Sequence, residues 1–254
     1  MGALAAFQQQ FSWESGQAVL IESPYPRRYL TGFPSSAGVL VITPTAALLL
    51  IDFRYYHAAK AQVAEAEVAL LQNAGEQLGR WFSEQGVGQV VMEADETSLS
   101  AFASYQQNFP LLSFLADGRV DRQLREMRQI KSRRELERVR EAQRLTDESF
   151  AHLLSLISPG MTEVALAAEI DFFIRKSGGQ NAFDTIALSG PNTANPHGVP
   201  SARALRKGEL VLMDFGAKVD GYCADMTRTV ALGDPGEEAR AVYQTVLDAR
   251  QAAF

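Results

Sequence analysis

The sequence is poor in the residues on which several common protein architectures depend. Its 254 residues contain one cysteine, Cys223, and three histidines. A single cysteine excludes an intrachain disulfide framework and a four-cysteine zinc site, and it is typical of a reducing compartment. No uninterrupted apolar run approaches the roughly 18 residues that a membrane-spanning helix needs. Lys and Arg number 24 against 30 Asp and Glu, so the basic excess typical of nucleic-acid-binding proteins is absent.

The first residues carry no targeting pattern. Residues 1–10 have no basic flank before their short apolar stretch, so we expect no signal peptide. Met1-Gly2 begins like a myristoylation site, but Ala6 stands where serine or threonine is needed. We therefore expect a cytoplasmic protein that binds neither membrane nor nucleic acid.

Strand-like and helix-like segments alternate along the first half of the chain. Hydrophobic residues make up 46% and charged residues 21%, close to the average of globular proteins. Short β-rich runs separated by Ala- and Glu-rich stretches predict an α/β layer with a partly parallel sheet. The expected strands are residues 18–21, 38–42, 47–51 and 89–92, and the expected helices are residues 58–71 and 76–85.

A domain boundary is expected near residues 125–131. Ser132, followed three residues later by Glu135, is a capping-box signature that predicts a helix from there to about residue 157. The second half should contain further helices over residues 162–176 and 237–254. We therefore expect two domains, residues 1–125 and 126–254.

Two strand-like runs, residues 210–217 and 222–230, flank Asp220-Gly221, which is a strong β-hairpin signal. Each run is interrupted by a carboxylate, Asp214 in the first and Asp225 in the second. Polar residues inside such apolar strands are candidates for a functional site.

The turn of this hairpin decides how the two carboxylates pair. If Val219-Asp220 forms the loop, Asp214 and Asp225 lie directly opposite each other. If Asp220-Gly221 forms it, Asp214 faces Thr227 and Asp225 is the diagonal neighbour. Because side chains alternate along a strand, both registers put the two carboxylates on one face.

Two ionised carboxylates so close together repel each other and are costly to bury. A shared divalent cation would remove that cost, and oxygen ligands suit Mn²⁺, Mg²⁺, Zn²⁺ or Co²⁺. The alternative is that one aspartate faces solvent or pairs with Arg228 or Lys218.

His197 is the second candidate for a functional residue. Residues 195–200 hold it in a Pro- and Gly-rich loop, where catalytic side chains are often found, although a surface role is the alternative. His57 and His152 are expected to be packing residues. Cys223 is expected to be a small buried hydrophobe rather than a nucleophile, since no base accompanies it.

Three segments together resemble a known family. Asn195-Pro196-His197-Gly198, residues 208–217 and residues 220–229 closely resemble the proline-specific metallopeptidases of the pita-bread fold (creatinase, prolidase and methionine aminopeptidase). Within this family the closest likeness is to the Xaa-Pro dipeptidases (prolidases) and Xaa-Pro aminopeptidases. Residues 29–33 and 52–55 resemble the creatinase-type N-terminal domain. The resemblance implies an α/β (α+β) protein with that domain at 1–125 and part of the catalytic domain at 126–254.

The resemblance also implies roles for individual residues. Asp214 would be a metal-ligating carboxylate and Asp225 a bridging one, in a site for two divalent ions such as Mn²⁺, Zn²⁺ or Co²⁺. His197 would lie outside the metal shell and contact substrate, and Thr227 would support the ligands. Short proline-containing peptides would be the substrates, and a homodimer is expected.

One departure from the family pattern bears on activity. The family completes its site with a histidine and two glutamates after the second aspartate. Here no histidine follows His197, and the only later glutamates are Glu237 and Glu238, at a helix start. We therefore expect a C-terminally truncated form that is inactive and binds metal weakly by itself.

Two other functions are compatible with this fold. One is a non-enzymatic binding module without a complete metal site, which the missing ligands favour and the two retained aspartates disfavour. The other is a metal-free, creatinase-like amidinohydrolase, which is disfavoured because that branch dispenses with the paired carboxylates.

Overall fold

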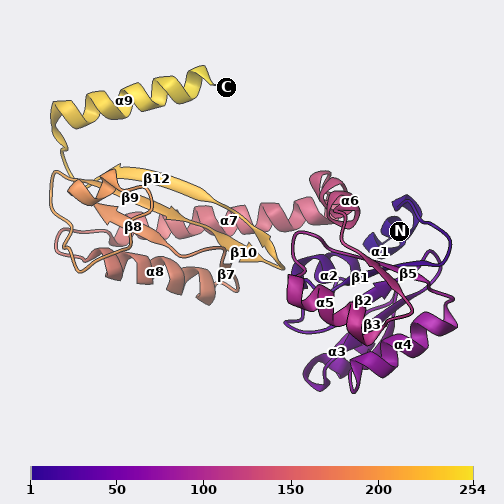
Figure 1. The fold of residues 1–254 in the computed structure, drawn as a ribbon. Coiled ribbons are helices and arrows are strands. Elements are labelled where there is room, and N and C mark those ends of the chain that lie inside the picture. The colour runs from indigo at the N-terminus through magenta and orange to yellow at the C-terminus, as the bar shows by residue number, and fades with distance from the viewer. Residues whose placement is uncertain (1, 254) are drawn as a thin grey trace. The chain divides into compact units, whose positions relative to one another are not determined.

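The computed structural model describes residues 2–253, which form two compact units, one ending at Ile130 and the other beginning at Lys131 (Figure 1). Each unit has its own hydrophobic core. Helix α6 (Arg119–Gln129) runs across the boundary expected between residues 125 and 126. Its Val120 and Leu124 are buried in the core of the first unit, so the whole helix belongs to that unit.

The first unit is built on a six-stranded sheet of order β4-β3-β2-β1-β5-β6. The pairs β1–β5, β5–β6 and β3–β4 are parallel, and the pairs β1–β2 and β2–β3 are antiparallel, which confirms the expected partly parallel sheet. Its strands are β1 (Gln17–Ile21), β2 (Val39–Ile42), β3 (Ala47–Ile51), β4 (Glu67–Leu70), β5 (Gln89–Met92) and β6 (Ser113–Leu115). Besides α6, its helices are α1 (Ala3–Gln10), α2 (Pro24–Thr31), α3 (Phe53–Gln62), α4 (Ala74–Glu84) and α5 (Leu99–Asn108).

Helices cover both faces of this sheet, which explains why its central strands are continuous apolar runs. All five residues of β1 are buried. Val19 and Ile21 pack into the cluster with α1, α2, α3 and α6, whereas Ala18 and Leu20 pack into the cluster with α4. A strand buried on both faces has no polar alternation.

The helix expected over residues 58–71 is wrong. Helix α3 begins earlier, because Asp52 caps it by accepting a hydrogen bond from the Arg54 backbone N–H, and it ends at Gln62. The later part of the expected helix is strand β4, which pairs in parallel with buried β3. The Ala- and Glu-rich composition favours a helix, but pairing with a neighbouring strand outweighs that local preference.

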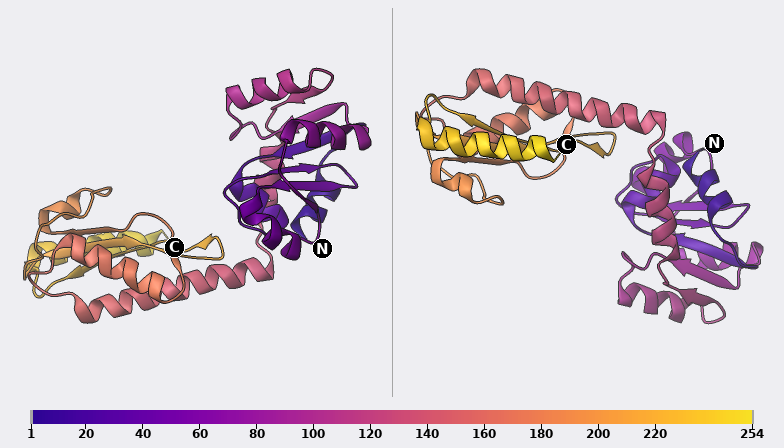
Figure 2. Two further views of the ribbon diagram at one scale, coloured as in Figure 1. Left: turned by 90° about the horizontal axis from the view of Figure 1, so that it is seen from below. Right: turned by 90° about the horizontal axis from the view of Figure 1, so that it is seen from above.

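The second unit packs two long helices against a three-stranded antiparallel sheet of order β12-β9-β8 (Figures 1 and 2). A smaller sheet, β11-β10-β7, continues the hairpin. The helices are α7 (Arg133–Leu156), α8 (Glu163–Lys176) and α9 (Gly236–Ala252), with the short 3₁₀ helix η1 (Gly190–Ala194). The strands are β7 (Gln180–Asn181), β8 (Ile186–Ser189), β9 (Leu210–Phe215), β10 (Ala217–Val219), β11 (Tyr222–Cys223) and β12 (Met226–Ala231).

Local signals place the helices of this unit correctly. The capping box at the start of α7 is present: the Ser132 hydroxyl accepts from the Glu135 N–H, and the Glu135 carboxylate accepts from the Ser132 N–H. The Thr162 hydroxyl caps α8 in the same manner by accepting from the Ala165 N–H. Within residues 2–253, no helix is both long enough and apolar enough to span a bilayer.

Candidate metal centre

Strand β9 places Asp214 on the side of the sheet that faces away from helices α7 and α8. Val211, Met213 and Phe215 are fully buried in the core formed with these helices. Leu212 and Asp214 alternate with them and are half-buried. We call the face that carries Leu212 and Asp214 the outer face of the β12-β9-β8 sheet.

The hairpin adopts the register with Asp220-Gly221 in the loop. Val219 pairs with Tyr222 in the small sheet, and Asp214 pairs with Thr227 in the larger one. Asp220 has φ 49° and Gly221 φ 83°. Positive φ at both central positions defines the tight turn that suits the twist of a hairpin, and glycine adopts it without strain.

Asp225 lies in the short break between β11 and β12. Ala224 and Met226, on either side of it, are buried, whereas Asp225 and Thr227 are exposed. This alternation puts Asp225 on the outer face together with Thr227, the residue paired with Asp214.

A glycine at position 216 makes this arrangement possible. A Cβ atom there would lie 1.8 Å from the carbonyl oxygen of Ala224. Any side chain at this position would force the two strands apart and move Asp225 with them. The sequence Asp214-Phe215-Gly216 therefore combines a carboxylate with the close strand approach that places it.

The two carboxylates have different surroundings. Oδ1 of Asp214 is buried and has no hydrogen-bond partner within the described part of the chain. A buried carboxylate oxygen without a donor is destabilising, and a bound cation would satisfy it. Asp225 is exposed. Its position therefore agrees with the alternative in which one of the two aspartates faces solvent. Among residues 2–253 neither aspartate forms an ion pair with Arg228 or Lys218.

The residues present fit a divalent ion in part. Asp214 and Asp225 supply oxygen donors on one face, and the unpartnered Oδ1 of Asp214 is free to bind a cation. No group of three or more His, Cys, Asp or Glu side chains between residues 2 and 253 is arranged to hold a metal. The pair therefore provides part of a coordination set.

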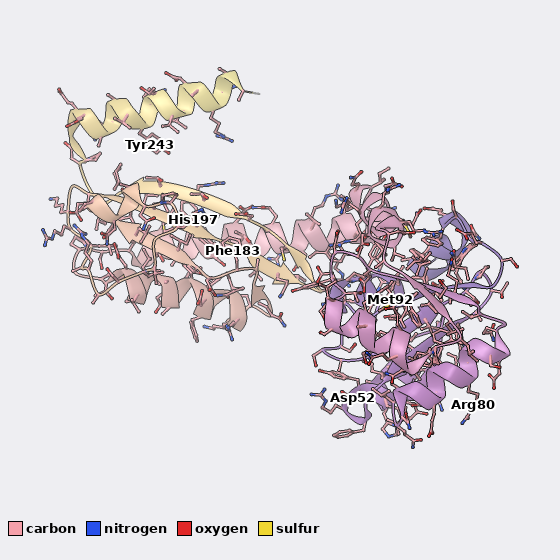
Figure 3. All side chains as sticks on the ribbon, viewed as in Figure 1. Asp52, Arg80, Met92, Phe183, His197 and Tyr243 are labelled. Atoms are coloured by element: carbon pink, nitrogen blue, oxygen red, sulfur yellow. The ribbon has the colours of Figure 1, made fainter. Side chains whose placement is uncertain are left out.

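The loop that carries His197 lies on the same outer face. Gly198 is buried, and a Cβ atom there would lie 2.8 Å from Cδ1 of Leu188. Leu188 pairs with Leu212, two residues from Asp214 on the same side of the sheet. The His197 side chain is exposed, and Figure 3 labels it on the second unit.

A small cavity of about 160 Å³ opens beside this loop. Its lining is Leu188, Asn192, Asn195, Gly198 and Val199. The loop itself is a tight turn, because Asn195 Oδ1 accepts from the His197 N–H and the Asn195 carbonyl accepts from the Gly198 N–H. The fold thus brings His197 and Asp214 to one face, although 17 positions separate them in the sequence.

Two expectations for individual residues, one in each unit, are corrected. Cys223 is exposed rather than buried, because it lies in the two-residue strand β11 near the hairpin tip, paired with Lys218. His57 is also exposed, with its ring 5.4 Å from that of Tyr56. His152 is a packing residue as expected, since its ring stacks on Phe173 at 4.5 Å.

One residue of the site region, Glu163, is not predicted from the sequence. Its side chain is fully buried at the start of α8 and contacts the segments on both sides of the His197 loop. An acidic residue in the first turn of a helix is common and indicates only helix capping, so no sequence signal pointed to it.

With this geometry in place, comparison with known proteins gives two family matches. Residues 4–130 match the creatinase/prolidase N-terminal domain, and residues 137–254 match metallopeptidase family M24. Together these matches cover nearly the whole chain.

Individual relatives agree with this assignment. An uncharacterized peptidase, YqhT, of Bacillus subtilis is 35% identical over 241 residues, and the match covers 91% of this chain and 65% of YqhT. A solved Xaa-Pro dipeptidase from Bacillus anthracis is 32% identical with a TM-score of 0.86, covering 92% of this chain and 65% of that one. A solved X-Pro aminopeptidase from Thermotoga maritima is 30% identical with a TM-score of 0.86, covering 92% and 68%.

The fold and the matches define a creatinase-type N-terminal domain followed by part of a pita-bread domain. The chain belongs to metallopeptidase family M24. It spans slightly less than two thirds of the length of the first curated relatives, 65% of one and 63% of another.

Proposed function

We propose that the protein is a metal-dependent exopeptidase that hydrolyses Xaa-Pro bonds in dipeptides or short peptides. The observation that carries this proposal is the pair Asp214 and Asp225 on the outer face, with Oδ1 of Asp214 buried and unpartnered. Family membership and relatives described as Xaa-Pro peptidases support it. We propose that the second domain, expected from the sequence at residues 126–254 and beginning after α6 in the structure, holds the site.

Different residues of the chain would bind the metal ions and the substrate. Asp214 and Asp225 would hold divalent ions, Asp225 as the bridging ligand, with Thr227 beside Asp214 to support the ligands. Two such ions (Mn²⁺, Zn²⁺ or Co²⁺) would supply a water of lowered pKa and polarise the scissile carbonyl. His197, exposed on the same face, would contact the substrate and donate a hydrogen bond to the oxygen that gains charge.

Proline sets a particular requirement on the leaving group. Its nitrogen is a tertiary amide without N–H, so a pocket must recognise the ring and a donor must protonate the departing amine. The substrate would therefore be recognised by the shape of its proline ring. We further propose a cytoplasmic homodimer that acts without nucleic acid or membrane.

A second candidate is a binding module on the same fold. It is favoured by one observation, the lack of a three-ligand metal group among residues 2–253. It predicts binding of proline-containing peptides without turnover, whatever metal is added.

The test is an assay of two polypeptides reconstituted with Mn²⁺, Zn²⁺ or Co²⁺. One is the 254-residue chain, and the other is an intact polypeptide that continues to the length of the relatives. Each is offered Ala-Pro, an Xaa-Pro tripeptide and Ala-Ala. We expect the intact polypeptide to cleave only the proline-containing peptides, and the 254-residue chain to bind metal weakly and show no turnover.

Each other result has a definite meaning. Equal cleavage of Ala-Ala would remove the proline specificity. Full turnover by the 254-residue chain would show that two carboxylates and His197 suffice. Peptide binding without any cleavage by the intact polypeptide would favour the binding module.

A further inference from the structure

Glu163 is a buried charge in the second unit, and both of its carboxylate oxygens are hydrogen-bonded. Its side chain has no exposed surface, although it carries a carboxylate. Oε1 accepts hydrogen bonds from the Ser189 N–H at 2.7 Å, the Ser189 hydroxyl at 2.9 Å and Asn192 Nδ2 at 3.0 Å. Oε2 accepts from Asn192 Nδ2 at 3.1 Å, the Ser201 N–H at 3.1 Å and the Ser201 hydroxyl at 2.7 Å.

These bonds keep the carboxylate ionised. Burial alone would raise the pKa of Glu163, but the hydrogen bonds from Ser201, Ser189 and Asn192 outweigh it, so the pKa is lowered. A negative charge at the first residue of helix α8 is also favoured by the helix dipole.

The partners of Glu163 lie on both sides of the His197 loop. Ser189 ends strand β8 and Asn192 lies in η1, both before the loop, and Ser201 follows His197 by four residues. One carboxylate therefore holds the two flanks of the loop together. Asn192 also lines the cavity beside the loop.

The start of α8 holds the segment after the loop by its backbone as well. The Glu163 N–H donates to the Arg203 carbonyl at 3.0 Å, and the Val164 N–H donates to the Ser201 carbonyl at 3.1 Å. The Arg203 guanidinium donates to the Ser189 hydroxyl at 2.7 Å and pairs with Glu209 at 2.5 Å. The position of the loop is thus determined by one polar network with Glu163 at its centre.

We infer that Glu163 is a positioning residue: its buried carboxylate fixes the His197 loop over the outer face of the sheet by binding the segments on either side of that loop. The inference rests on the proposed function, in which His197 contacts substrate. Glu163 itself would touch neither substrate nor metal, and would act through the loop.

A glutamine cannot replace this carboxylate. Each oxygen of the Glu163 carboxylate accepts a hydrogen bond from a backbone N–H, Oε1 from that of Ser189 and Oε2 from that of Ser201. Hydroxyl groups can rotate to accept a hydrogen bond, but a backbone N–H cannot. The amide nitrogen of Glu163→Gln would therefore face a donor in either orientation and leave one flank of the loop unbound.

The experiment compares three variants of the intact, metal-loaded polypeptide with the wild type. Glu163→Gln removes the central carboxylate. Ser201→Ala is milder because it removes one of the hydrogen bonds to that carboxylate, together with the one that the Ser201 hydroxyl accepts from the Arg203 N–H. Glu169→Gln is the matched control, since Glu169 lies on the same helix but is half-exposed and outside the network. The readouts are amide hydrogen exchange of residues 190–203, the melting temperature, and kcat and KM on an Xaa-Pro substrate.

We expect Glu163→Gln to raise amide exchange in residues 190–203 and to lower kcat by about 10- to 100-fold, because small displacements of a catalytic group have such effects. KM should change much less, since the hydrogen bond proposed for His197 strengthens only as the substrate oxygen gains charge. Ser201→Ala should show the same pattern at smaller amplitude, and Glu169→Gln should match the wild type.

Wild-type exchange and kcat in Glu163→Gln would overturn the inference. If Glu163→Gln does not fold, Ser201→Ala provides the test. Wild-type amide exchange in residues 190–203 and wild-type kcat in Ser201→Ala would then overturn the inference. If the wild type cleaves no Xaa-Pro substrate, the proposed function fails, and the exchange of residues 190–203 alone decides whether Glu163 holds the loop.

Discussion

At the residue scale, the half-buried carboxylate of Asp214 has the largest consequence for the proposed metal site. Its Oδ1 is enclosed by protein and lacks a donor among the described residues, whereas Asp225 is open to solvent. A cation that binds both would relieve the cost at Asp214 and immobilise Asp225. The stability of the second unit should therefore depend on divalent metal through Asp214.

Asp214→Asn tests this dependence. Mn²⁺ at ten times its dissociation constant should stabilise the wild-type chain by about 1.4 kcal/mol, because a ligand that binds only the folded state adds RT ln(1 + [L]/Kd). The variant should lose this stabilisation, since an amide is a much weaker ligand for Mn²⁺. Chemical unfolding with and without Mn²⁺ measures both.

Asp147→Asn is the control, because Asp147 is an exposed aspartate on helix α7 away from the outer face. It should respond to Mn²⁺ like the wild type. Equal Mn²⁺ stabilisation of Asp214→Asn and the wild type would count against a metal at this position.

A second residue-scale effect concerns pH. Glu93, which is 2% exposed, accepts from the backbone N–H groups of Glu22 and Ser23 at 3.0 and 3.1 Å. Burial raises the pKa of Glu93 above its usual value, and these two hydrogen bonds offset only part of that effect. Folding therefore favours the protonated carboxyl, so its stabilising contribution is complete below the unfolded-state pKa and is lost as the pH rises through the folded-state pKa.

Glu93→Gln should remove this dependence. Relative to the wild type, the free energy of unfolding of the variant should increase as the pH rises from 4 to 8, as measured by urea unfolding at several pH values. Glu96→Gln, an exposed position in the segment after β5, should follow the wild type. A constant difference between Glu93→Gln and the wild type at every pH would contradict the raised pKa.

At the scale of elements, capping signals fix the starts of α7 and α8, whereas composition alone misplaced the helix expected over residues 58–71. The capping box at Ser132 and Glu135 starts α7 where expected, and the Glu135 carboxylate also accepts from the Tyr222 hydroxyl of β11 at 3.1 Å. The helix start is therefore tied to the hairpin that carries the site. Loss of the cap should destabilise this unit.

Ser132→Ala should lower the free energy of unfolding of the second unit by about 1 kcal/mol, a usual value for a lost N-cap. Both tryptophans, Trp13 and Trp81, lie in the first unit, so their fluorescence reports that unit while far-UV circular dichroism reports both. The dichroism transition should shift and the fluorescence transition should not.

Ser155→Ala is the comparison, because Ser155 is an exposed serine near the other end of α7 whose hydroxyl bonds only the His152 carbonyl. It should change stability less than Ser132→Ala. A Ser132→Ala chain with wild-type dichroism and fluorescence transitions would show that the cap contributes nothing measurable.

At the scale of the whole molecule, two units with separate cores account for the organisation of the chain. The first is a mixed sheet covered by helices on both faces, and the second is an antiparallel sheet covered by α7 and α8 on one face. The two carboxylates and the His197 loop lie on the outer face of the second unit, the side of the sheet that α7 and α8 do not cover. One face packed on a core and the other free of it is common in antiparallel sheets.

The sequence by itself determined the starts of α7 and α8 and the position of the hairpin, and it supplied the residues proposed for the site, because capping, turn chemistry and strand alternation act over a few residues. It left the hairpin register open between two loops, and the fold decided it at Asp220-Gly221. Only the tertiary structure turned residues 67–70 into a strand, exposed Cys223, and joined Glu163 to both flanks of the His197 loop. These outcomes depend on contacts between residues distant in the chain, whose energies exceed the local preferences that the sequence displays.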